Sequence, residues 1–179
     1  MSSPTGKNAE RVPDASSRSA SEDAQPAPSP CNGHALRRAS RRVSQLYDAV
    51  IAPCGLRSTQ RSMLAQISRL DAPTMGELAR ALVLDRSALA HNIKPLERDG
   101  YLTITPDPQD KRTRRVSLTA RGEAKLEQSI ALWEDAQQRF ESVFGATQAQ
   151  ELRRTLALIS SSRFVEAFEQ AEPDDYSGD

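Results

Sequence analysis

The sequence has 179 residues and carries 24 Lys and Arg against 24 Asp and Glu, so its formal net charge is zero. This length suffices for a domain with its own core, and an aromatic content of 4% argues against a large aromatic-rich β-sandwich. Two cysteines are too few for a disulfide-stapled secreted scaffold. No apolar run approaches the roughly 18 residues of a membrane span, and the N-terminus lacks the apolar stretch of a secretory signal. We therefore expect a mainly helical, cytoplasmic protein.

Charge is distributed unevenly along the chain. Residues 111–121 read KRTRRVSLTAR, with five basic residues and no acidic one, so the rest of the chain nets minus five. The last segment, 169–179, carries five acids and no base. The local field decides whether an anionic partner binds, so a whole-chain pI near 6.8 does not argue against one.

A central region, 31–168, lies between two polar ends. Residues 1–30 are mostly Ser, Pro, Ala and charged residues, which cannot bury enough apolar surface to offset their ordering entropy and predict a disordered tail. The acidic segment 169–179 has a similar composition and predicts a second tail. Between the tails, apolar residues recur mostly with the helical period.

The first apolar stripe predicts a helix over 34–51, which Pro53 and Gly55 end. Ser58 or Thr59 is expected to cap a second helix. The inner face of this second helix is predicted to hold Met63, Leu64 and Ile67.

Two short helices joined by a turn are predicted next. Thr74 and Glu77 have the spacing of a capping box. Asp85 is expected to cap the following helix, which runs to about Asp99 and is followed by Gly100 in a left-handed conformation. This arrangement is a helix-turn-helix signature.

A hairpin and two long helices complete the predicted fold, which is mostly α with a small β-hairpin. Alternating residues over 101–105 and 114–118 predict two strands joined by a turn rich in Pro and Asp. A long helix is expected after Thr119 and ends at Gly145. A second capping box, over 147–150, is expected to open a last helix. The apolar stripe of this last helix contains Leu152, Leu156, Ile159 and Phe168.

The helix after Asp85 presents a polar face suited to DNA. Leu89, Ile93 and Leu96 lie on one side and are expected to pack inward. Donors and cations at the helix start and on its other side suit the phosphates and base edges of a major groove. These predicted DNA contacts are Arg86, Ser87, His91 and Lys94. A solvated amphipathic face is the alternative interpretation.

The tip of the predicted hairpin, 107–115, gathers four cations, beginning with Lys111. A narrow basic hairpin can enter the minor groove, where the negative potential favours arginine. A solubilising turn is the alternative, but a cation cluster directly after a helix-turn-helix favours DNA. The predicted DNA contacts on the hairpin are Arg112, Arg114 and Arg115.

The order of these elements and several sequence phrases resemble the winged helix-turn-helix of the MarR family of bacterial regulators. The phrases are Gly55-Leu-Arg-Ser-Thr-Gln60, Glu77-Leu-Ala79, Leu96-Glu-Arg-Asp-Gly100, Asp107 with Asp110-Lys-Arg112, and Leu118-Thr-Ala-Arg-Gly122. The Asp-x-Arg phrase followed by Leu-Thr-x-x-Gly is the most specific of them. The resemblance is strongest over about 55–122, and the flanking helices, about 34–52 and 120–168, match the dimerisation helices of the family.

The resemblance implies a homodimer that binds a near-palindromic operator in double-stranded DNA. Arg112 matches the wing arginine that enters the minor groove, and Asp110 matches the acid that orients wing arginines. The predicted contacts from Arg86 to Lys94 fall on the recognition helix. Pro95, inside this helix, is a departure from the family pattern. Proline removes a backbone hydrogen bond, so we expect a kink at this position.

The first and last helices carry more apolar surface than one small winged domain can cover. We therefore expect them to form the dimer interface, and two-fold symmetry would place two recognition helices on one face of DNA. An intramolecular core is the alternative role for these residues. The interface candidates are Leu36, Val43, Leu46, Leu152, Leu156, Ile159 and Phe164.

The two cysteines stand at either end of the first helix and are redox candidates. A helix of roughly 20 residues would separate Cys31 from Cys54 by about 30 Å, so a disulfide between them has to be intermolecular or requires unfolding. Some MarR-family members, of the OhrR and MosR type, sense oxidants through an N-terminal cysteine, and residues 31–43 resemble the start of such members. Two inert thiols are the alternative, because spacing alone does not reveal reactivity.

Other effectors stay open at this point. In the MarR family, small aromatic acids or phenols lodge between the dimer helices and the DNA-binding part. Candidate residues for lining that space are Tyr47, Arg41, Met63 and Trp133, each of which packing or surface exposure would also explain. No metal or cofactor is predicted, because a zinc site would need ligands to converge from distant parts of the chain. Those ligands would be Cys31, His34, Cys54 and His91.

Two other classes of function compete with a DNA-binding regulator. An enzyme is not expected, because the chain has no Gly-rich phosphate loop, no GxSxG or HExxH motif and only two histidines. A helical dimerisation module that never binds DNA is the remaining alternative, and the basic hairpin argues against it. The sequence thus predicts a dimeric winged-helix regulator, with repression favoured over activation, released by an effector or by thiol oxidation.

Overall fold

The structure is a computed structural model of the chain that describes residues 30–171. The predicted tails therefore lie outside the described residues at 1–29 and 172–179, although the last helix extends to Gln170, two residues into the predicted acidic tail. The chain separates into two units, 1–38 and 39–179. Among the described helices, none is both long and apolar enough to cross a membrane.

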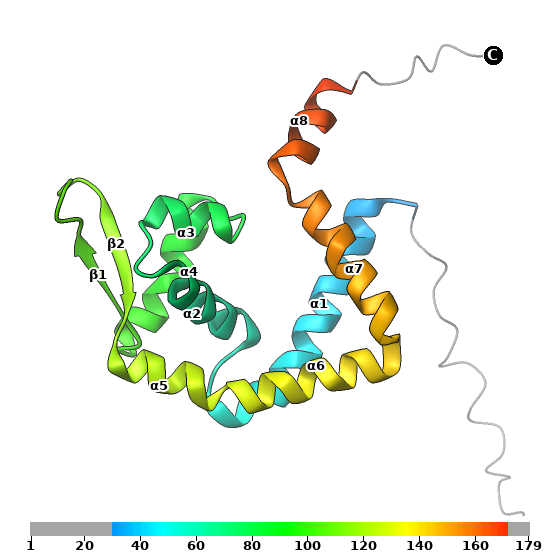
Figure 1. Ribbon diagram of the computed structural model, residues 1–179, viewed down its shortest axis with the longest axis horizontal. Coiled ribbons are helices and arrows are strands. Elements are labelled where there is room, and N and C mark those ends of the chain that lie inside the picture. Colours follow the sequence, from blue (N-terminus) through cyan, green and yellow to red (C-terminus); the bar gives the residue numbers. More distant parts are fainter. Residues whose placement is uncertain (1–29, 172–179) are drawn as a thin grey trace, which may run out of the picture. The chain divides into compact units, whose positions relative to one another are not determined.

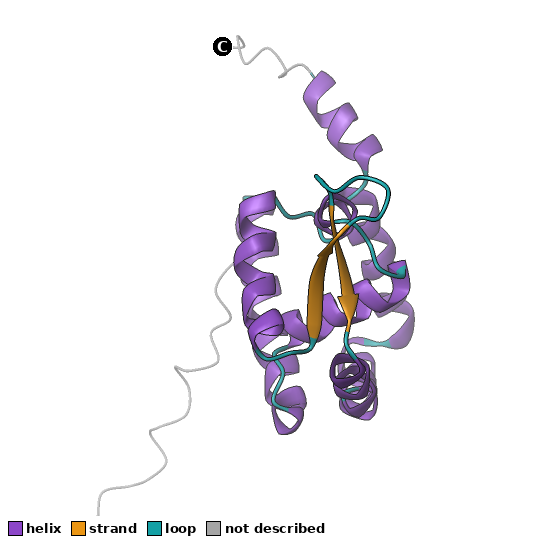
Figure 2. Ribbon diagram, turned by 90° about the vertical axis from the view of Figure 1, so that its left-hand side faces the viewer, coloured by secondary structure: helices purple, strands orange, loops and turns teal. Residues whose placement is uncertain are grey.

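Helices dominate the described chain, and one antiparallel hairpin interrupts them, which confirms the predicted fold class (Figures 1 and 2). In the first unit, the described residues include the start of helix α1, which continues into the second unit. The elements in order are α1 (Asn32–Ile51), the 3₁₀ turn η2 (Ala52–Cys54), α2 (Ser58–Leu70), α3 (Met75–Ala81), α4 (Arg86–Arg98), β1 (Leu102–Pro106), β2 (Arg114–Leu118), α5 (Ala120–Gln128), α6 (Ile130–Phe144), α7 (Ala146–Ile159) and α8 (Ser162–Gln170).

One apolar core joins α2, α3, α4 and the hairpin, and we call this part the DNA-binding lobe. Its buried residues come from every one of these elements, so the helix pair and the hairpin form a single packed body. The predicted inner faces of α2 and α4 are confirmed. The core residues of the lobe are Leu56, Met63, Leu64, Ile67, Leu78, Ala79, Leu89, Ile93, Leu96, Leu102 and Val116.

The hairpin is fixed to the helix pair at its base. Leu102 pairs with Leu118 at one end of the ladder, and Pro106 pairs with Arg114 at the other. On the outer edge of β2, the Val116 N–H donates to the carbonyl of Pro73 at 2.9 Å. The loop between α2 and α3 therefore forms a single β-bridge with β2, between Thr74 and Arg115, beside the two-stranded hairpin.

The predicted caps of α3 and α4 are confirmed. Thr74 Oγ1 accepts from the Glu77 N–H at 3.1 Å, and the Glu77 carboxylate accepts from the Thr74 N–H at 2.8 Å. Asp85 accepts from the Ala88 N–H at 2.7 Å. Gly100 adopts the left-handed conformation, with φ of 72°. Each cap satisfies a backbone donor that the first turn of a helix leaves unpaired, so both helix starts are set locally by the sequence.

Gly122 shows why the phrase Leu118-Thr-Ala-Arg-Gly122 is specific. A Cβ at Gly122 would stand 1.8 Å from the Tyr101 carbonyl oxygen, so only glycine permits this approach of α5 to the hairpin. Thr119 caps α5 and also donates its hydroxyl to the Gly100 carbonyl at 2.7 Å. The phrase therefore fixes the start of α5 against the end of α4.

Four details differ from the predictions. The N-cap of α2 is Arg57, not Ser58 or Thr59, because Asp48 takes both the N–H and the hydroxyl of Ser58 at 2.6 Å. The long helix after Thr119 is two helices separated at Ser129.

The last helix also begins and continues differently. The capping box over 147–150 does not form, because α7 already begins at Ala146 and Thr147 lies inside it. A turn at Ser160 and Ser161 then separates α7 from α8, and the Ser161 side chain caps α8. α4, by contrast, runs unbroken through Pro95 to Arg98.

Val83 provides a test of backbone strain in the turn between α3 and α4. It has φ of 52° and a side chain 70% exposed, so a β-branched residue adopts a disfavoured conformation without burial to compensate. Because glycine relieves this strain but loses more entropy on folding, we expect Val83→Gly to raise the free energy of unfolding by about 1 kcal/mol in urea denaturation. Ala124→Gly, inside α5, is the control and should lower it by about 1 kcal/mol. A lower free energy of unfolding for Val83→Gly than for the wild type would contradict the proposal that the backbone at Val83 is strained.

Candidate nucleic-acid interface

The predicted contacts on α4 share an exposed face. The side opposite to them packs into the lobe through Leu89, Ile93 and Leu96, so the position of the exposed face is fixed by the core. Arg86 and Ser87 are the first residues after the Asp85 cap and belong to the first turn of the helix. All four predicted contacts are exposed, namely Arg86, Ser87, His91 and Lys94.

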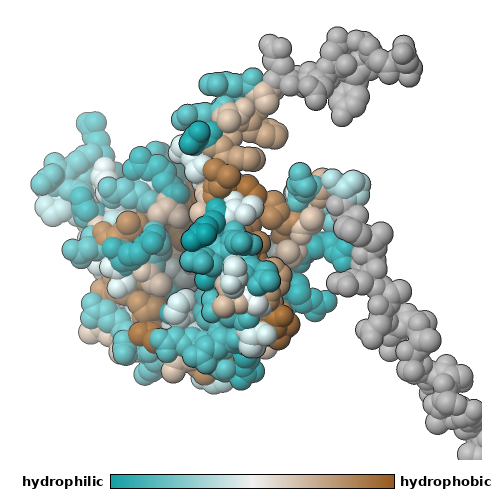
Figure 3. All heavy atoms as spheres, turned by 45° about the vertical axis from the view of Figure 1, so that its right-hand side comes forward, coloured by the Kyte–Doolittle hydropathy of each residue, from teal (hydrophilic) through white to brown (hydrophobic). Residues whose placement is uncertain are grey.

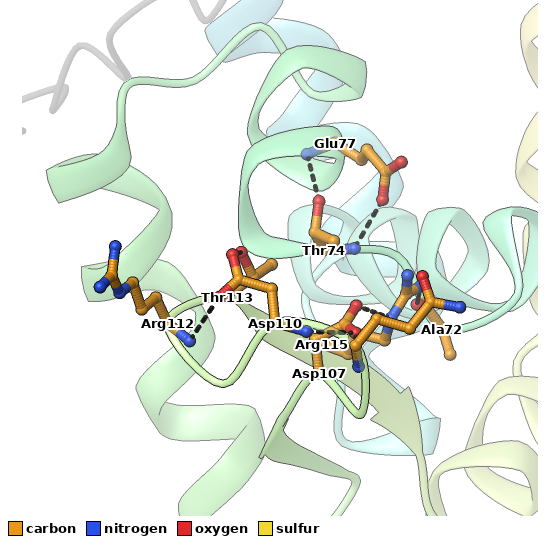
Figure 4. A network of polar contacts seen from close by, with 9 residues as sticks. Ala72, Thr74, Glu77, Asp107, Asp110, Arg112, Thr113 and Arg115 are labelled. Carbon is orange, nitrogen blue, oxygen red and sulfur yellow. Dashed lines mark hydrogen bonds and ion pairs between the residues drawn. The ribbon is translucent and has the colours of Figure 1, made fainter.

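Arg115 occupies a different place from the one predicted, inside the base of the wing (Figure 4). Its Nε donates to Asp107 Oδ2 at 2.5 Å, and its Nη1 donates to the Ala72 carbonyl at 2.9 Å. The Asp107 side chain is 7% exposed and that of Arg115 is 38% exposed, so the carboxylate is shielded from water while the guanidinium stays partly accessible. Arg115 therefore ties the hairpin to the α2–α3 loop and is not placed as a free cation for DNA.

Asp107 organises the turn of the wing as well as Arg115. Its Oδ1 accepts from the Gln109 N–H at 2.7 Å and from the Asp110 N–H at 3.3 Å. These backbone hydrogen bonds, together with the Arg115 guanidinium, lower the pKa of Asp107 below its ordinary value, because they favour the charged carboxylate. Asp107 thus remains ionised at neutral pH.

Asp110 was predicted to orient a wing arginine, but its contacts are with the turn itself. Its Oδ1 accepts from the backbone N–H of Arg112 at 3.0 Å, and its Oδ2 accepts from the hydroxyl of Thr113 at 3.1 Å. It orders the backbone that carries Arg112 and, among residues 30–171, forms no ion pair with a guanidinium. Asp107 is the acid that holds an arginine side chain.

Three cations of the wing remain directed to solvent. Lys111, Arg112 and Arg114 are exposed, and within residues 30–171 their side chains take part in none of the ion pairs. Figure 4 shows the Arg112 side chain extending away from the Asp107–Arg115 pair. The wing therefore presents three solvent-exposed positive charges. They stand on a turn whose backbone is held by the carboxylates of Asp107 and Asp110.

A cleft lies beside the recognition helix, between α1, α2 and α4. Its volume is about 710 Å³. His91, Asn92 and Pro95 form the part of the lining that α4 supplies, and Arg57 adds a cation from the start of α2. The remaining lining residues are Val43, Ser44, Tyr47, Ser58, Thr59, Gln60, Ser62, Met63, Leu82 and Leu84.

Of the four residues predicted to line an effector space, Tyr47 and Met63 line this cleft. The Tyr47 hydroxyl donates to Gln137 at 2.9 Å, and burial raises the pKa of this phenol. Arg41 does not line the cleft, and Trp133 instead stacks on the guanidinium of Arg61, 4.4 Å from the ring centroid. The sequence did not predict that Arg57 lines the cleft or that Asp107 pairs with Arg115. Both Arg57 and Asp107 belong to the sequence phrases that resemble the MarR family, which was the one available signal.

The predicted interface residues retain exposed surface. Figure 3 shows apolar atoms, in brown, along the helices that precede the C-terminal segment, and Phe164 and Phe168 stack there with ring centroids 6.4 Å apart. None of the seven candidates is buried in the described structure. Four of them are more than a third exposed, namely Leu36, Leu46, Leu156 and Phe164, and three are half-buried, namely Val43, Leu152 and Ile159.

The cysteines lie in different units, Cys31 exposed before α1 and Cys54 half-buried in η2. The Cys54 carbonyl accepts from Lys125 Nζ at 3.1 Å, which holds η2 against α5. Within the described residues no group of three or more His, Cys, Asp or Glu side chains could hold a metal ion. Cys31 and Cys54 therefore stay redox candidates as two separate thiols.

Comparisons with known proteins all find similarity to regulators of one family. The family model that matches is that of the MarR family, over residues 56–113. The structure of the transcriptional regulator MosR from M. tuberculosis in complex with DNA is 34% identical, with a TM-score of 0.68 over 76% of this chain and 97% of that chain. A variant of MarR from E. coli complexed with operator DNA is 26% identical, with a TM-score of 0.64 over 71% and 91% of the two chains.

A curated relative is also similar over the lobe. The transcriptional activatory protein BadR from Rhodopseudomonas palustris is 37% identical over 71 residues, which are 38% of this chain. The match spans 41% of the length of BadR, so the similarity concerns the DNA-binding part.

The pairing of Asp107 gives a pH-dependent prediction for the wing. The pKa of Asp107 is lowered in the folded state, so its contribution to stability is full above its unfolded pKa and is lost as the pH falls through the folded pKa. We expect Asp107→Asn to lower the free energy of unfolding at about pH 7 and to differ less from the wild type at about pH 3. Urea unfolding at both pH values measures this difference. A gap between the two proteins that is constant with pH would contradict the role of the charged carboxylate.

Proposed function

The chain belongs to the MarR family of DNA-binding transcriptional regulators, and from this premise we propose that it is a homodimeric repressor of a near-palindromic operator. The observation that carries the proposal is the joint exposure of the α4 face and of Lys111, Arg112 and Arg114 on one packed lobe. A helix face of donors beside a cationic hairpin suits simultaneous contact with a major and a minor groove.

The two elements have different tasks in this proposal. Side chains of α4, from Arg86 to Lys94, read base edges and give sequence preference. Arg112 and Arg114 bind phosphates or the minor groove and supply affinity that depends on salt. Arg115 is a positioning residue, since its pairing with Asp107 and the Ala72 carbonyl holds the hairpin at a fixed place beside the helices.

Dimerisation supplies the second half-site. The exposed apolar residues of α1, α7 and α8 are suited to cover those of a second copy, and closed two-fold symmetry is the commonest arrangement of homo-oligomers. The two recognition helices would then contact half-sites about one helical turn apart. The competing function is a helical dimerisation module that uses the same apolar surface but never binds DNA. The cationic wing favours the DNA-binding regulator over this module.

Release from DNA has two candidate triggers. A small aromatic acid or phenol fits the chemistry of the cleft, where Tyr47, Met63 and Leu84 offer apolar contacts and Arg57 offers a cation. Its occupant would contact α4 directly at His91, Asn92 and Pro95. Oxidation of Cys31 or Cys54 is the second trigger, supported by the exposed position of Cys31 beside α1.

Substitutions on the wing separate contact from positioning. We expect Arg112→Ala to lower operator affinity about tenfold and to reduce the slope of log K against log salt by about one, because one phosphate-neutralising cation is lost. Arg115→Lys should also weaken binding but leave the slope unchanged, because Arg115 holds Asp107 and does not meet DNA. Fluorescence anisotropy on the gene's own upstream DNA across a salt series measures both. Equal salt slopes for Arg112→Ala and the wild type would contradict the proposed contact of Arg112 with DNA. Wild-type binding to the upstream DNA that is no tighter than binding to random DNA would favour the module that does not bind DNA.

The thiol trigger has a direct test. We expect peroxide to weaken operator binding by the reduced wild-type protein, and Cys31→Ser to make binding insensitive to peroxide while Cys54→Ser leaves the response intact. Operator affinity at fixed salt, before and after treatment and again after a thiol reductant, is the measurement. Binding that ignores peroxide in all three proteins would discard the thiol switch and leave ligand binding in the cleft as the trigger.

A further inference from the structure

On its C-terminal side, the DNA-binding lobe and the adjoining α5 connect to α6, and so to the proposed dimerisation helices α7 and α8, through one residue, Ser129. Before it, α5 packs against α2 and β2 of the lobe, and after it, α6 packs against α7 (Figure 1). The two helices follow each other directly along the chain, separated only at this position. Any change in the direction of α6 relative to α5 therefore reorients the lobe relative to the proposed interface.

Local hydrogen bonding explains the break at Ser129. Its side chain is completely buried, and its hydroxyl donates to the Leu126 carbonyl at 2.6 Å. The N–H of Ser129 donates to the same carbonyl at 3.0 Å. One acceptor three residues back thus takes two donors, which replaces the regular α-helical ladder at this point and leaves Ser129 with φ of −85° and ψ of −10°.

Ser142 shows that the hydroxyl bond alone does not break a helix. Its hydroxyl donates to the Arg139 carbonyl, also three residues back, at 2.9 Å, and Ser142 still belongs to α6, in the last turn before the helix ends at Phe144. Ser142 is exposed, so water can serve its hydroxyl equally well. Ser129 is shielded from bulk solvent, so its buried hydroxyl is satisfied within the protein, by a backbone carbonyl.

The contact just after the break is incompletely satisfied. Arg61 of α2 lies over Trp133 in the first turn of α6, and the Nε of Arg61 is buried without a hydrogen-bond acceptor among the described residues. An unpaired buried donor costs free energy. Besides the turn at Ser129, the contact of Arg61 with Trp133 joins α6 to α2 of the lobe, and it does so through the face of the guanidinium.

We propose that Ser129 is a positioning residue that sets the angle between the DNA-binding lobe and α6, and with it the spacing of the two recognition helices. This inference rests on the proposed dimeric operator binding. Ser129 contacts no DNA in this scheme. Its hydroxyl acts only through the helix direction that it imposes.

Removal of the hydroxyl defines the variant. In Ser129→Ala, the Leu126 carbonyl loses the hydroxyl donor and keeps only the backbone N–H of residue 129. A regular ladder, in which this carbonyl accepts from the N–H of Ile130, then competes with the turn, so α5 and α6 can join as one helix. The angle between the lobe and α6 changes, and the fixed half-sites of the natural operator no longer match the two recognition helices. Binding of random DNA depends on phosphate contacts of each lobe and does not require that match.

The experiment compares operators whose half-site spacing is lengthened or shortened by one base pair. We expect Ser129→Ala to lose about tenfold affinity for the natural spacing, to prefer an altered spacing, and to bind random DNA within about twofold of the wild type. Ser142→Ala is the matched control and should keep the natural optimum. An unchanged spacing optimum in Ser129→Ala overturns the proposal, even when its overall affinity is lower.

A second measurement needs no DNA. A spin label at Glu97→Cys, an exposed position on α4, in a background with Cys31→Ser and Cys54→Ser, reports the distance between recognition helices of a dimer. The distance distribution is expected to shift in Ser129→Ala and to stay in place in Ser142→Ala, and no shift overturns the proposal. Absence of any intermolecular distance overturns the proposed dimer and this inference together, whereas a shifted distance without operator preference overturns only the proposed function.

Discussion

The ion pair between Arg115 and Asp107 is the interaction on which the interface depends. It joins the hairpin to itself across the turn, and the second bond of Arg115, to the Ala72 carbonyl, joins the hairpin to the loop that opens the helix pair. A two-stranded hairpin is marginally stable by itself. Anchored at its base by this pair and by the bond from Val116 to Pro73, it becomes part of the rigid lobe.

The same anchoring explains why the wing can present charge. Asp107 and Asp110 direct their oxygens to backbone N–H groups of the turn, so most of their hydrogen-bonding capacity is used to shape the loop. Lys111, Arg112 and Arg114 are left exposed and outside the ion pairs of the described chain. A turn that contains acids in its sequence thus has a cationic surface, and counting charges along the chain would not reveal this separation.

Local signals in the sequence predicted most of the lobe, because its caps and strands depend on residues a few positions apart. The Thr74–Glu77 box, the Asp85 cap and the left-handed Gly100 are of this kind. What the sequence did not predict depends on distant partners or on burial. Ser58 is taken by Asp48, Arg115 reaches Ala72, and Ser129 breaks a helix only because its hydroxyl is buried. The sequence therefore predicted where the candidate site lies, while the hydrogen bonds that make Asp107 and Arg115 part of the support of the wing became visible only in the structure.

α4 takes part in two surfaces at once, and this limits how regulation can work. Its outward face carries the proposed DNA contacts, while His91, Asn92 and Pro95 line the cleft. The third side, with Leu89, Ile93 and Leu96, is locked in the core, so an occupant of the cleft cannot easily move α4 within its lobe. A close-packed body responds to such a load by moving as a whole. Control of DNA binding would then pass through the connections of the lobe to α1 and α6. At the first, Asp48 holds Ser58, and at the second, the Nε of Arg61 has no hydrogen-bond acceptor among the described residues.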